Sequence, residues 1–372
     1  MMPTMNRRQF VLATTAAGTT LAMDRVLAAE PDAPPRYEAV VKTVADAVLR
    51  DFPQPPPFNW GEGVLVTGMM RAYRLTKDPR YLDFVRRFGD HHYERGIEAT
   101  LRQRGYCGHW GPGFPMLMLF EETGQQRYLE LAQQICDFMV NDAERTADGG
   151  LSHFNGKPQL WVDTLDMCCP VFSNLARLAD RPQLQEEAIR QLEIFARHLQ
   201  DPQTGMFYHM WDETSGQRTP AFWGRGNGWV VMSYVEVLKN EKADSSNRRR
   251  LVDPLSKQLA GIAPLQDNET GLWRTVLDAP DTYLEGSASS MFLYGMAECR
   301  GRKLLAIPYA EVMRRAWRGL DKTIGLDGRA GGVSAGTGPS GKEGYLERDI
   351  GTYTWGTGSL LLAGCACAEF GT

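Results

Sequence analysis

Two carboxylates lie three residues apart in an otherwise apolar stretch, QLWVDTLDMCC, which runs from Gln159 to Cys169. On a helix, Asp163 and Asp166 would point within about 60° of each other, so one can face a cavity while the other bonds a backbone group or an arginine. A carboxyl group beside Trp161 in an apolar wall is expected to have a raised pKa, which suits a general acid. Asp163 is therefore the first candidate catalyst. The alternative is that it only caps the helix that it opens.

Aromatic and polar side chains recur together in the segments that interrupt the helical patterns. Indole faces stack on pyranose rings, carboxylates and amides bond hydroxyl groups, and arginine pairs a uronate carboxylate through two N–H groups. Repeated clusters of this kind favour a carbohydrate cleft over tryptophans that are buried for packing alone. The candidate ligand-binding residues are Trp60, His109, His153, Trp161, His209, Trp211, Trp223, Arg225, Asn227, Trp229 and Glu285.

Several other classes of function find no support in the sequence. The glycine-rich run from Gly224 to Gly228 follows no strand and matches neither GxGxxG nor GK[ST], so it does not indicate a phosphate loop. The net charge of -4 gives no footprint for nucleic acid or an anionic membrane. The six histidines and seven cysteines show no metal-ligand spacing. Neither a metal nor another cofactor is expected.

The periodicity of apolar residues predicts an all-α protein, because few β-branched alternating runs occur. The predicted helices cover residues 64–75, 81–93, 128–140, 163–178, 183–199, 229–238, 251–262, 287–299, 309–324 and 359–370.

Two turn-and-helix devices recur along the chain. TKDPRYL at 76–82 returns as TGQQRYL at 123–129, and LQDPQTGM at 199–206 returns as LQDNETGL at 265–272. Self-similarity at this spacing, with two helices per unit, predicts an array of helical hairpins. About six pairs fit if each takes roughly 50 residues. Closed into a ring, they form a single (α/α)6 barrel whose long loops carry the site at one end.

The N-terminus resembles a bacterial twin-arginine export signal. Arg7 and Arg8 precede a short apolar run, and Val26-Leu27-Ala28 offers a small-residue cleavage site. The alternative is a frayed helix with two chance arginines. No later apolar run is long enough to span a bilayer. We expect a signal peptide over 1–29, a linker over 30–56, a barrel domain over 57–372, and a periplasmic or secreted product.

Taken in order, the clusters resemble glycoside hydrolase family 105, the unsaturated rhamnogalacturonyl hydrolases, and the related family 88. The matching stretches are WGEGV at 60–64, PG at 112–113 before FEETG at 120–124, GGLSH at 149–153, WVDTLDM at 161–167, TGMFYHMWD at 204–212, FWGRGNGW at 222–229, QDNETGLW at 266–273 and YLEGSASSM at 283–291. The resemblance covers about residues 57–370, and it implies the (α/α)6 barrel.

The resemblance also implies an activity on oligosaccharides that polysaccharide lyases leave with a terminal C4=C5 unsaturated uronate. In such enzymes an aspartic acid protonates C4, positive charge develops at C5, water adds there, and the rearranging hemiketal releases the aglycone. Carried over, Asp163 is the proton donor and then the water activator. Arg225 and Trp229 would bind and stack the sugar. His153 and His209 would line the pocket.

One position departs from the family's pattern. The family usually has a second aspartate a few residues before the Pro-Gly pair, and here Gly108 or His109 takes its place. Asp166, Asp212 or Glu285 could supply the second acid. His109 could also substitute for it. The alternatives are therefore a uronidase or lyase for saturated uronates on the same barrel, and a non-catalytic sugar-binding barrel.

Overall fold

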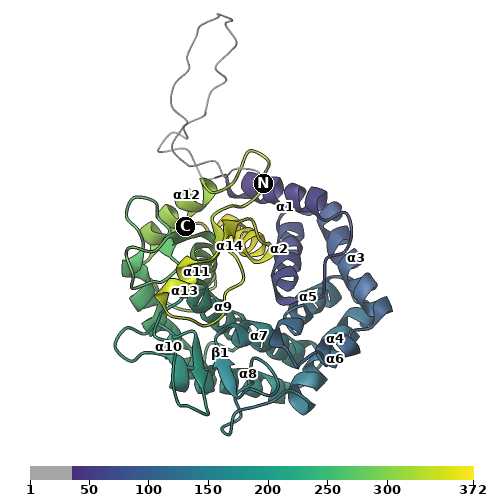
Figure 1. The fold of residues 1–372 in the computed structure, drawn as a ribbon. Coiled ribbons are helices and arrows are strands. Elements are labelled where there is room, and N and C mark those ends of the chain that lie inside the picture. Colours follow the sequence, from purple (N-terminus) through teal and green to yellow (C-terminus); the bar gives the residue numbers. More distant parts are fainter. Residues whose placement is uncertain (1–35) are drawn as a thin grey trace, which may run out of the picture. The chain divides into compact units, whose positions relative to one another are not determined.

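Six inner helices form a ring and six outer helices cover it in residues 36–372, the part of the chain that the computed structural model describes (Figure 1). Outer and inner helices alternate along the chain. The inner helices are α2 (Trp60–Thr76), α5 (Gly113–Thr123), α7 (Asp163–Leu178), α9 (Gly224–Lys239), α11 (Gly286–Gly301) and α14 (Thr354–Phe370). The outer helices are α1 (Tyr37–Asp51), α3 (Pro79–Arg95), α6 (Gln126–Asn141), α8 (Pro182–Leu199), α10 (Ser246–Ile262) and α12 (Ala310–Asp321). The predicted (α/α)6 barrel is confirmed.

The two layers differ in how much of each helix is buried. The outer helix α3 buries one stripe, with Tyr81, Phe84, Val85 and Phe88 at the spacing of an amphipathic helix. The inner helix α9 is buried along almost its whole length, because it has neighbours on every side. Small residues let the inner helices approach closely.

Helices α2 and α14 approach each other closely. A Cβ on Gly68 of α2 would lie 2.7 Å from the carbonyl oxygen of Gly358 on α14, so a larger residue would push the two helices apart. The inner ring therefore depends on small residues at defined positions.

Because the helices alternate in direction, all six inner helices begin at the same end of the barrel. The short elements there are the strand pairs β1 (Gln159–Trp161) with β2 (Met210–Asp212), β3 (Trp273–Arg274) with β4 (Leu284–Glu285) and β5 (Val333–Ser334) with β6 (Ile350–Gly351), the 3-10 helix η1 (Cys107–His109) and the helix α13 (Lys342–Leu346). Helix N-termini carry partial positive charge, so this end favours anions.

Residues 37–51 lie inside the segment that was expected to be a linker, yet they form helix α1. Val41, Val44, Ala45 and Val48 are buried along one face of it, and α1 packs on α14. The twin-arginine stretch lies outside the described residues. Within 36–372, the helices are all too short or too polar to cross a membrane.

Candidate active site

A pocket of about 250 Å³ opens at the end of the barrel where the inner helices begin. Trp60, Trp161 and Trp223 supply aromatic walls, and Asp163 and Arg225 supply charge. The remaining lining residues are Tyr106, Cys107, Gly108, His153, Phe154, Met167, Gly336, Thr337 and Gly338. Asp163 is the only carboxylate among the described residues that line this pocket.

Strand pairing brings Asp163 to His209. β1 pairs with β2 in antiparallel register, and the backbone N–H of Val162 donates to the carbonyl of His209 at 3.0 Å. Nε2 of His209 then lies 3.1 Å from Oδ2 of Asp163. The Asp163 side chain makes no capping hydrogen bond to α7. The alternative that Asp163 serves only as a helix cap is therefore wrong.

Tyr345 of α13 fixes the orientation of His209. The Tyr345 hydroxyl accepts from the backbone N–H of Ser340 at 3.3 Å and lies 2.9 Å from Nδ1 of His209. With the hydroxyl donating to Nδ1, the ring carries its proton on Nε2, which points at Asp163. His209 is thus a directed donor to the carboxylate. Its ring is fully buried and absent from the described pocket lining, so the prediction that His209 lines the pocket is wrong.

The pKa of Asp163 is lower than its ordinary value, which corrects the prediction of a raised one. Burial alone would raise it, but the hydrogen bond from His209 and the electrostatic influence of His209, His153 and Arg225 outweigh burial. The sequence motif predicted the apolar wall around Asp163. It did not predict that His153, His209 and Arg225 would influence the carboxylate, because they belong to other segments of the chain.

The raised pKa belongs to Asp166 instead. Burial and the nearby carboxylates of Glu236 and Asp163 raise the pKa of Asp166 well above its usual range. Asp166 and Glu236 line a separate cavity of about 20 Å³ inside the barrel, which shares Trp60 and Met167 with the pocket above it. Asp166 therefore does not supply a second acid to the pocket.

Arg225 holds a loop over the pocket. Its Nη1 donates to the carbonyl and hydroxyl oxygens of Ser334 at 3.0 and 2.6 Å, and its Nη2 donates to Ala335 and Thr337 at 2.9 and 3.0 Å. Its guanidinium also lies 4.6 Å from the Trp223 ring. The expected bidentate pairing of this arginine with a uronate is therefore corrected, because its terminal N–H groups are engaged. Its Nε is buried and has no hydrogen-bond partner among the described residues.

Glu285 is a structural residue rather than a ligand-binding one. It is fully buried, caps α11 by accepting from the N–H of Ala288 at 2.7 Å, and accepts from the N–H of Ser334 at 2.9 Å. Its Oε1 lies 3.6 Å from Nη1 of Arg225. Glu285 thus fixes the arginine and the loop, and the prediction that it binds substrate or acts as the second acid is wrong.

One more predicted ligand-binding residue, Trp211, points away from the pocket. Trp211 lies opposite Leu160 in the β1–β2 pair, and its ring stacks on His198 at 3.8 Å. Asp212, a candidate for the second acid, accepts from Gln159 at 2.7 Å and is absent from the described pocket lining. Neighbouring residues of a strand face opposite sides of it, and Trp161 is paired with Met210. Trp211 therefore lies on the other face of the strand pair from Trp161.

Three further predictions are corrected by burial. Asn227 bonds the backbone N–H and C=O of Phe207 at 2.8 and 2.9 Å and so ties that loop to α9. Trp229 is fully buried against the edge of Trp60, with the ring centroids 6.1 Å apart. His109 packs against Tyr106 and is absent from the described pocket lining. None of these three residues is in the described pocket lining, and each packs against or bonds residues next to it.

His153 lies where it was predicted, and it carries an unexpected partner. Its ring stacks on Trp161 at 4.0 Å, and its Nδ1 lies 3.1 Å from Sγ of Cys107. Burial lowers the pKa of His153 to about 3 and raises that of Cys107. The histidine is therefore neutral and the thiol protonated, so Cys107 can donate to Nδ1.

Four residues of the site were not predicted from the sequence: Tyr106, Cys107, Thr337 and Tyr345. Tyr106 and Cys107 stand directly before the expected position of the second acid. Thr337 and Tyr345 lie beyond residue 291, where the last of the motifs quoted from the sequence ends.

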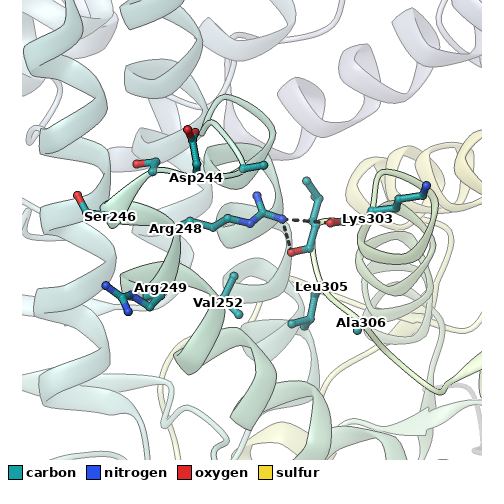
Figure 2. Close-up of a pocket in the computed structure, with 11 residues that line it drawn as sticks. Asp244, Ser246, Arg248, Arg249, Val252, Lys303, Leu305 and Ala306 are labelled. Carbon is teal, nitrogen blue, oxygen red and sulfur yellow. Dashed lines mark hydrogen bonds between the residues drawn. The ribbon is translucent and has the colours of Figure 1, made fainter.

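A larger cavity, of about 520 Å³, lies elsewhere, between the start of α10 and the loop after α11 (Figure 2). Arg248 donates there to the carbonyl oxygens of Lys303 and Leu304 (Figure 2). Among its described lining residues it has no aromatic ring, and it is widely open. The smaller pocket around Asp163 is the better candidate, because it combines enclosure, aromatic walls and convergent polar groups.

Known proteins similar to this chain are glycoside hydrolases. Glycosyl Hydrolase Family 88 matches residues 37–370. The unsaturated rhamnogalacturonyl hydrolase YesR of Bacillus subtilis is 29% identical over 307 residues, with 81% of this chain and 86% of that protein covered. An unsaturated 3S-rhamnoglycuronyl hydrolase of an Alteromonas species is 23% identical, with 82% and 76% covered.

Solved structures give the same grouping. A possible member of glycoside hydrolase family 105 from Klebsiella pneumoniae superposes with a TM-score of 0.81 at 25% identity, covering 95% of this chain and 98% of that one. The barrel is therefore shared with proteins of the glycoside hydrolase families. The chain belongs to glycosyl hydrolase family 88 and is similar to a possible member of the related family 105.

Proposed function

We propose that this protein removes an unsaturated uronic acid from the non-reducing end of lyase-generated oligosaccharides by hydrating its C4=C5 double bond. Asp163 is the general acid and base. The observation that carries the proposal is the isolated Asp163 carboxylate, held by His209 inside an aromatic pocket. The activities named for the similar Bacillus and Alteromonas proteins support the same reaction.

The shape and charge of the pocket support an anionic terminal sugar. Trp60 and Trp161 are partly exposed in the pocket and offer ring surface on which a sugar can stack. The N-termini of the inner helices and the charge of Arg225 favour a carboxylate. Ordinary glycosidases need two carboxylates in the site. Asp163 is the single one among the described lining residues, which argues against a uronidase for saturated sugars.

Asp163 must be protonated to act as an acid, and substrate binding favours its protonation. In the free protein its pKa is lowered by its basic neighbours, including Arg225. A bound uronate adds a negative charge nearby and partly neutralises Arg225. Both effects raise the pKa of Asp163. The carboxyl group then takes up a proton, delivers it to C4, and as a carboxylate accepts a proton from the water that attacks C5.

The test is the ultraviolet absorbance of the conjugated double bond. Purified protein is incubated with lyase products of rhamnogalacturonan, ulvan, glycosaminoglycan and gellan, and the absorbance is followed over time. A decrease with at least one substrate is expected, and the panel ranks the polysaccharides. A constant signal with every substrate would contradict the proposal.

We also propose that the protein is exported through the twin-arginine pathway to the periplasm or beyond. The Arg7-Arg8 pair before an apolar run supports this. Replacing both arginines with lysine should retain the protein in the cytoplasm of its host. Unchanged export of that variant would contradict the proposal.

A further inference from the structure

Tyr106 fills the space that a side chain at position 108 would need. A Cβ on Gly108 would lie 2.5 and 2.6 Å from Cε1 and Cζ of Tyr106, and 2.9 Å from Cδ1 of Trp60. Carbon atoms that are not bonded do not approach this closely. Gly108 has no positive φ, so it is required here for space rather than for backbone conformation. A Tyr106 ring in this position and a side chain on residue 108 exclude each other.

The Tyr106 ring is held on three sides. It stacks on Phe154 with the ring centroids 5.1 Å apart, and it meets His109 and His153 edge-on at 5.3 and 5.4 Å. Trp60 is a hydrogen-bonding neighbour of its hydroxyl. Tyr106 and Asp163 line the same pocket. The phenol is therefore a fixed part of the wall and is placed to meet a ligand.

A phenol offers a different chemistry from a carboxylate. Burial raises the pKa of Tyr106 above its ordinary value, and the negative charge of Asp163 adds to that effect. The hydroxyl therefore stays protonated at neutral pH and can donate a hydrogen bond without carrying charge. A second carboxylate would repel an anionic uronate, whereas a neutral donor does not.

We propose that Tyr106 takes over the place of the second acid and contacts the uronate directly, holding the sugar against Asp163 as a neutral hydrogen-bond donor. This inference rests on the proposed function. Asp163 then remains the one carboxylate in the described pocket lining that exchanges protons. The limb of the kcat/KM profile along which activity falls as pH rises and Asp163 loses its proton should therefore follow a single ionisation.

The first experiment compares Tyr106→Phe with the wild type on the preferred unsaturated disaccharide. Loss of one hydrogen bond should lower kcat/KM about three- to tenfold, with an unchanged melting temperature. Tyr93→Phe is the matched control, because Tyr93 bonds Glu130 on the outer surface. A Tyr106→Phe variant with the kcat/KM of the wild type would overturn the proposal.

A second experiment exchanges the two side chains. Tyr106→Ala with Gly108→Asp should have a higher kcat/KM than Tyr106→Ala alone, and its pH profile should gain a second acidic ionisation. This is expected because the aspartate would occupy the space that the ring vacates. A folded double variant that is no more active than Tyr106→Ala, and shows one ionisation, would contradict a shared place for the two groups.

A binding measurement separates this inference from the proposed function. In the Asp163→Asn background, which should not turn over, calorimetry gives the Kd for the unsaturated disaccharide and for its saturated counterpart. Adding Tyr106→Phe should raise the Kd about three- to tenfold. If the wild type consumes no unsaturated substrate, the proposed function is wrong. The Kd comparison still shows in that case whether the Tyr106 hydroxyl contacts the sugar. Equal Kd values with and without the hydroxyl would overturn it.

Discussion

Nε2 of His209 lies 3.1 Å from Oδ2 of Asp163, and the Tyr345 hydroxyl lies 2.9 Å from the opposite ring nitrogen. This chain of hydrogen bonds joins α13, the strand pair β1–β2 and the start of α7. It gives the candidate catalyst an orientation and a lowered pKa at the same time.

Replacing His209 should shift the pH dependence upward. The hydrogen bond from His209 lowers the pKa of Asp163, so His209→Phe should raise that pKa. The limb of the kcat/KM profile that belongs to Asp163 should then move to higher pH. His209→Gln, which can keep a donor, should move it less. An unmoved limb in a folded His209→Phe variant would show that the pair does not control Asp163.

Removing the buried acid Asp166 should stabilise the protein at higher pH. The folded chain holds a proton on Asp166 at pH values where the unfolded chain has released it, since the folded pKa is raised. The stability from this group is complete below the ordinary carboxyl pKa and is lost as pH rises through the folded pKa. The melting temperature of Asp166→Asn minus that of the wild type should therefore increase with pH across this interval.

Asp83→Asn is the control for that measurement, because Asp83 is 69% exposed on the outer layer. Its melting-temperature difference should show no such rise. A difference for Asp166→Asn that does not change with pH would contradict a raised pKa of Asp166.

The loop over the pocket should depend on the shape of Arg225 as well as on its charge. Lysine keeps the charge but cannot bond Ser334, Ala335 and Thr337 together, as both ends of the guanidinium do. Arg225→Lys should raise KM about tenfold or more and speed amide hydrogen exchange in residues 334–338. Wild-type exchange in that loop would show that another contact holds it.

The two tryptophans of the β1–β2 pair should behave differently. Trp161 lines the pocket, whereas Trp211 stacks on His198 outside it. Trp161→Ala should raise KM about tenfold, and Trp211→Ala should leave KM unchanged. Steady-state kinetics on one substrate decide the comparison. Equal effects of the two substitutions would mean that the pocket extends beyond the described walls.

The barrel was predicted from helical periodicity together with the repeated turn-and-helix segments. The helix expected over 163–178 has those bounds in the structure. The helix α5 was missed because its sequence begins Gly-Phe-Pro, which lacks the pattern of a helix start. The expected start of α9 was late for a similar reason, since Gly224 to Gly228 has the composition of a loop although it is helical. Buried inner helices need small residues more than they need high helix propensity.

The candidate site was predicted in part, for a physical reason. Trp60, His153, Trp161 and Trp223 were recognised because indole and imidazole groups in loops have few other uses. Asn227 and Glu285 have the same kind of signature, yet they serve the backbone. Which of these roles a polar residue has depends on long-range neighbours such as Ser334, and a single sequence does not show them.

The most direct test of the central claim compares the wild type with Asp163→Asn in the ultraviolet absorbance assay, using the preferred oligosaccharide. Asparagine keeps the shape of the side chain but cannot give or take the proton. The account predicts that the variant loses absorbance about 10²- to 10⁴-fold more slowly than the wild type, while the oligosaccharide still raises its melting temperature. A wild-type rate in Asp163→Asn would contradict the account, because another group would then protonate the double bond.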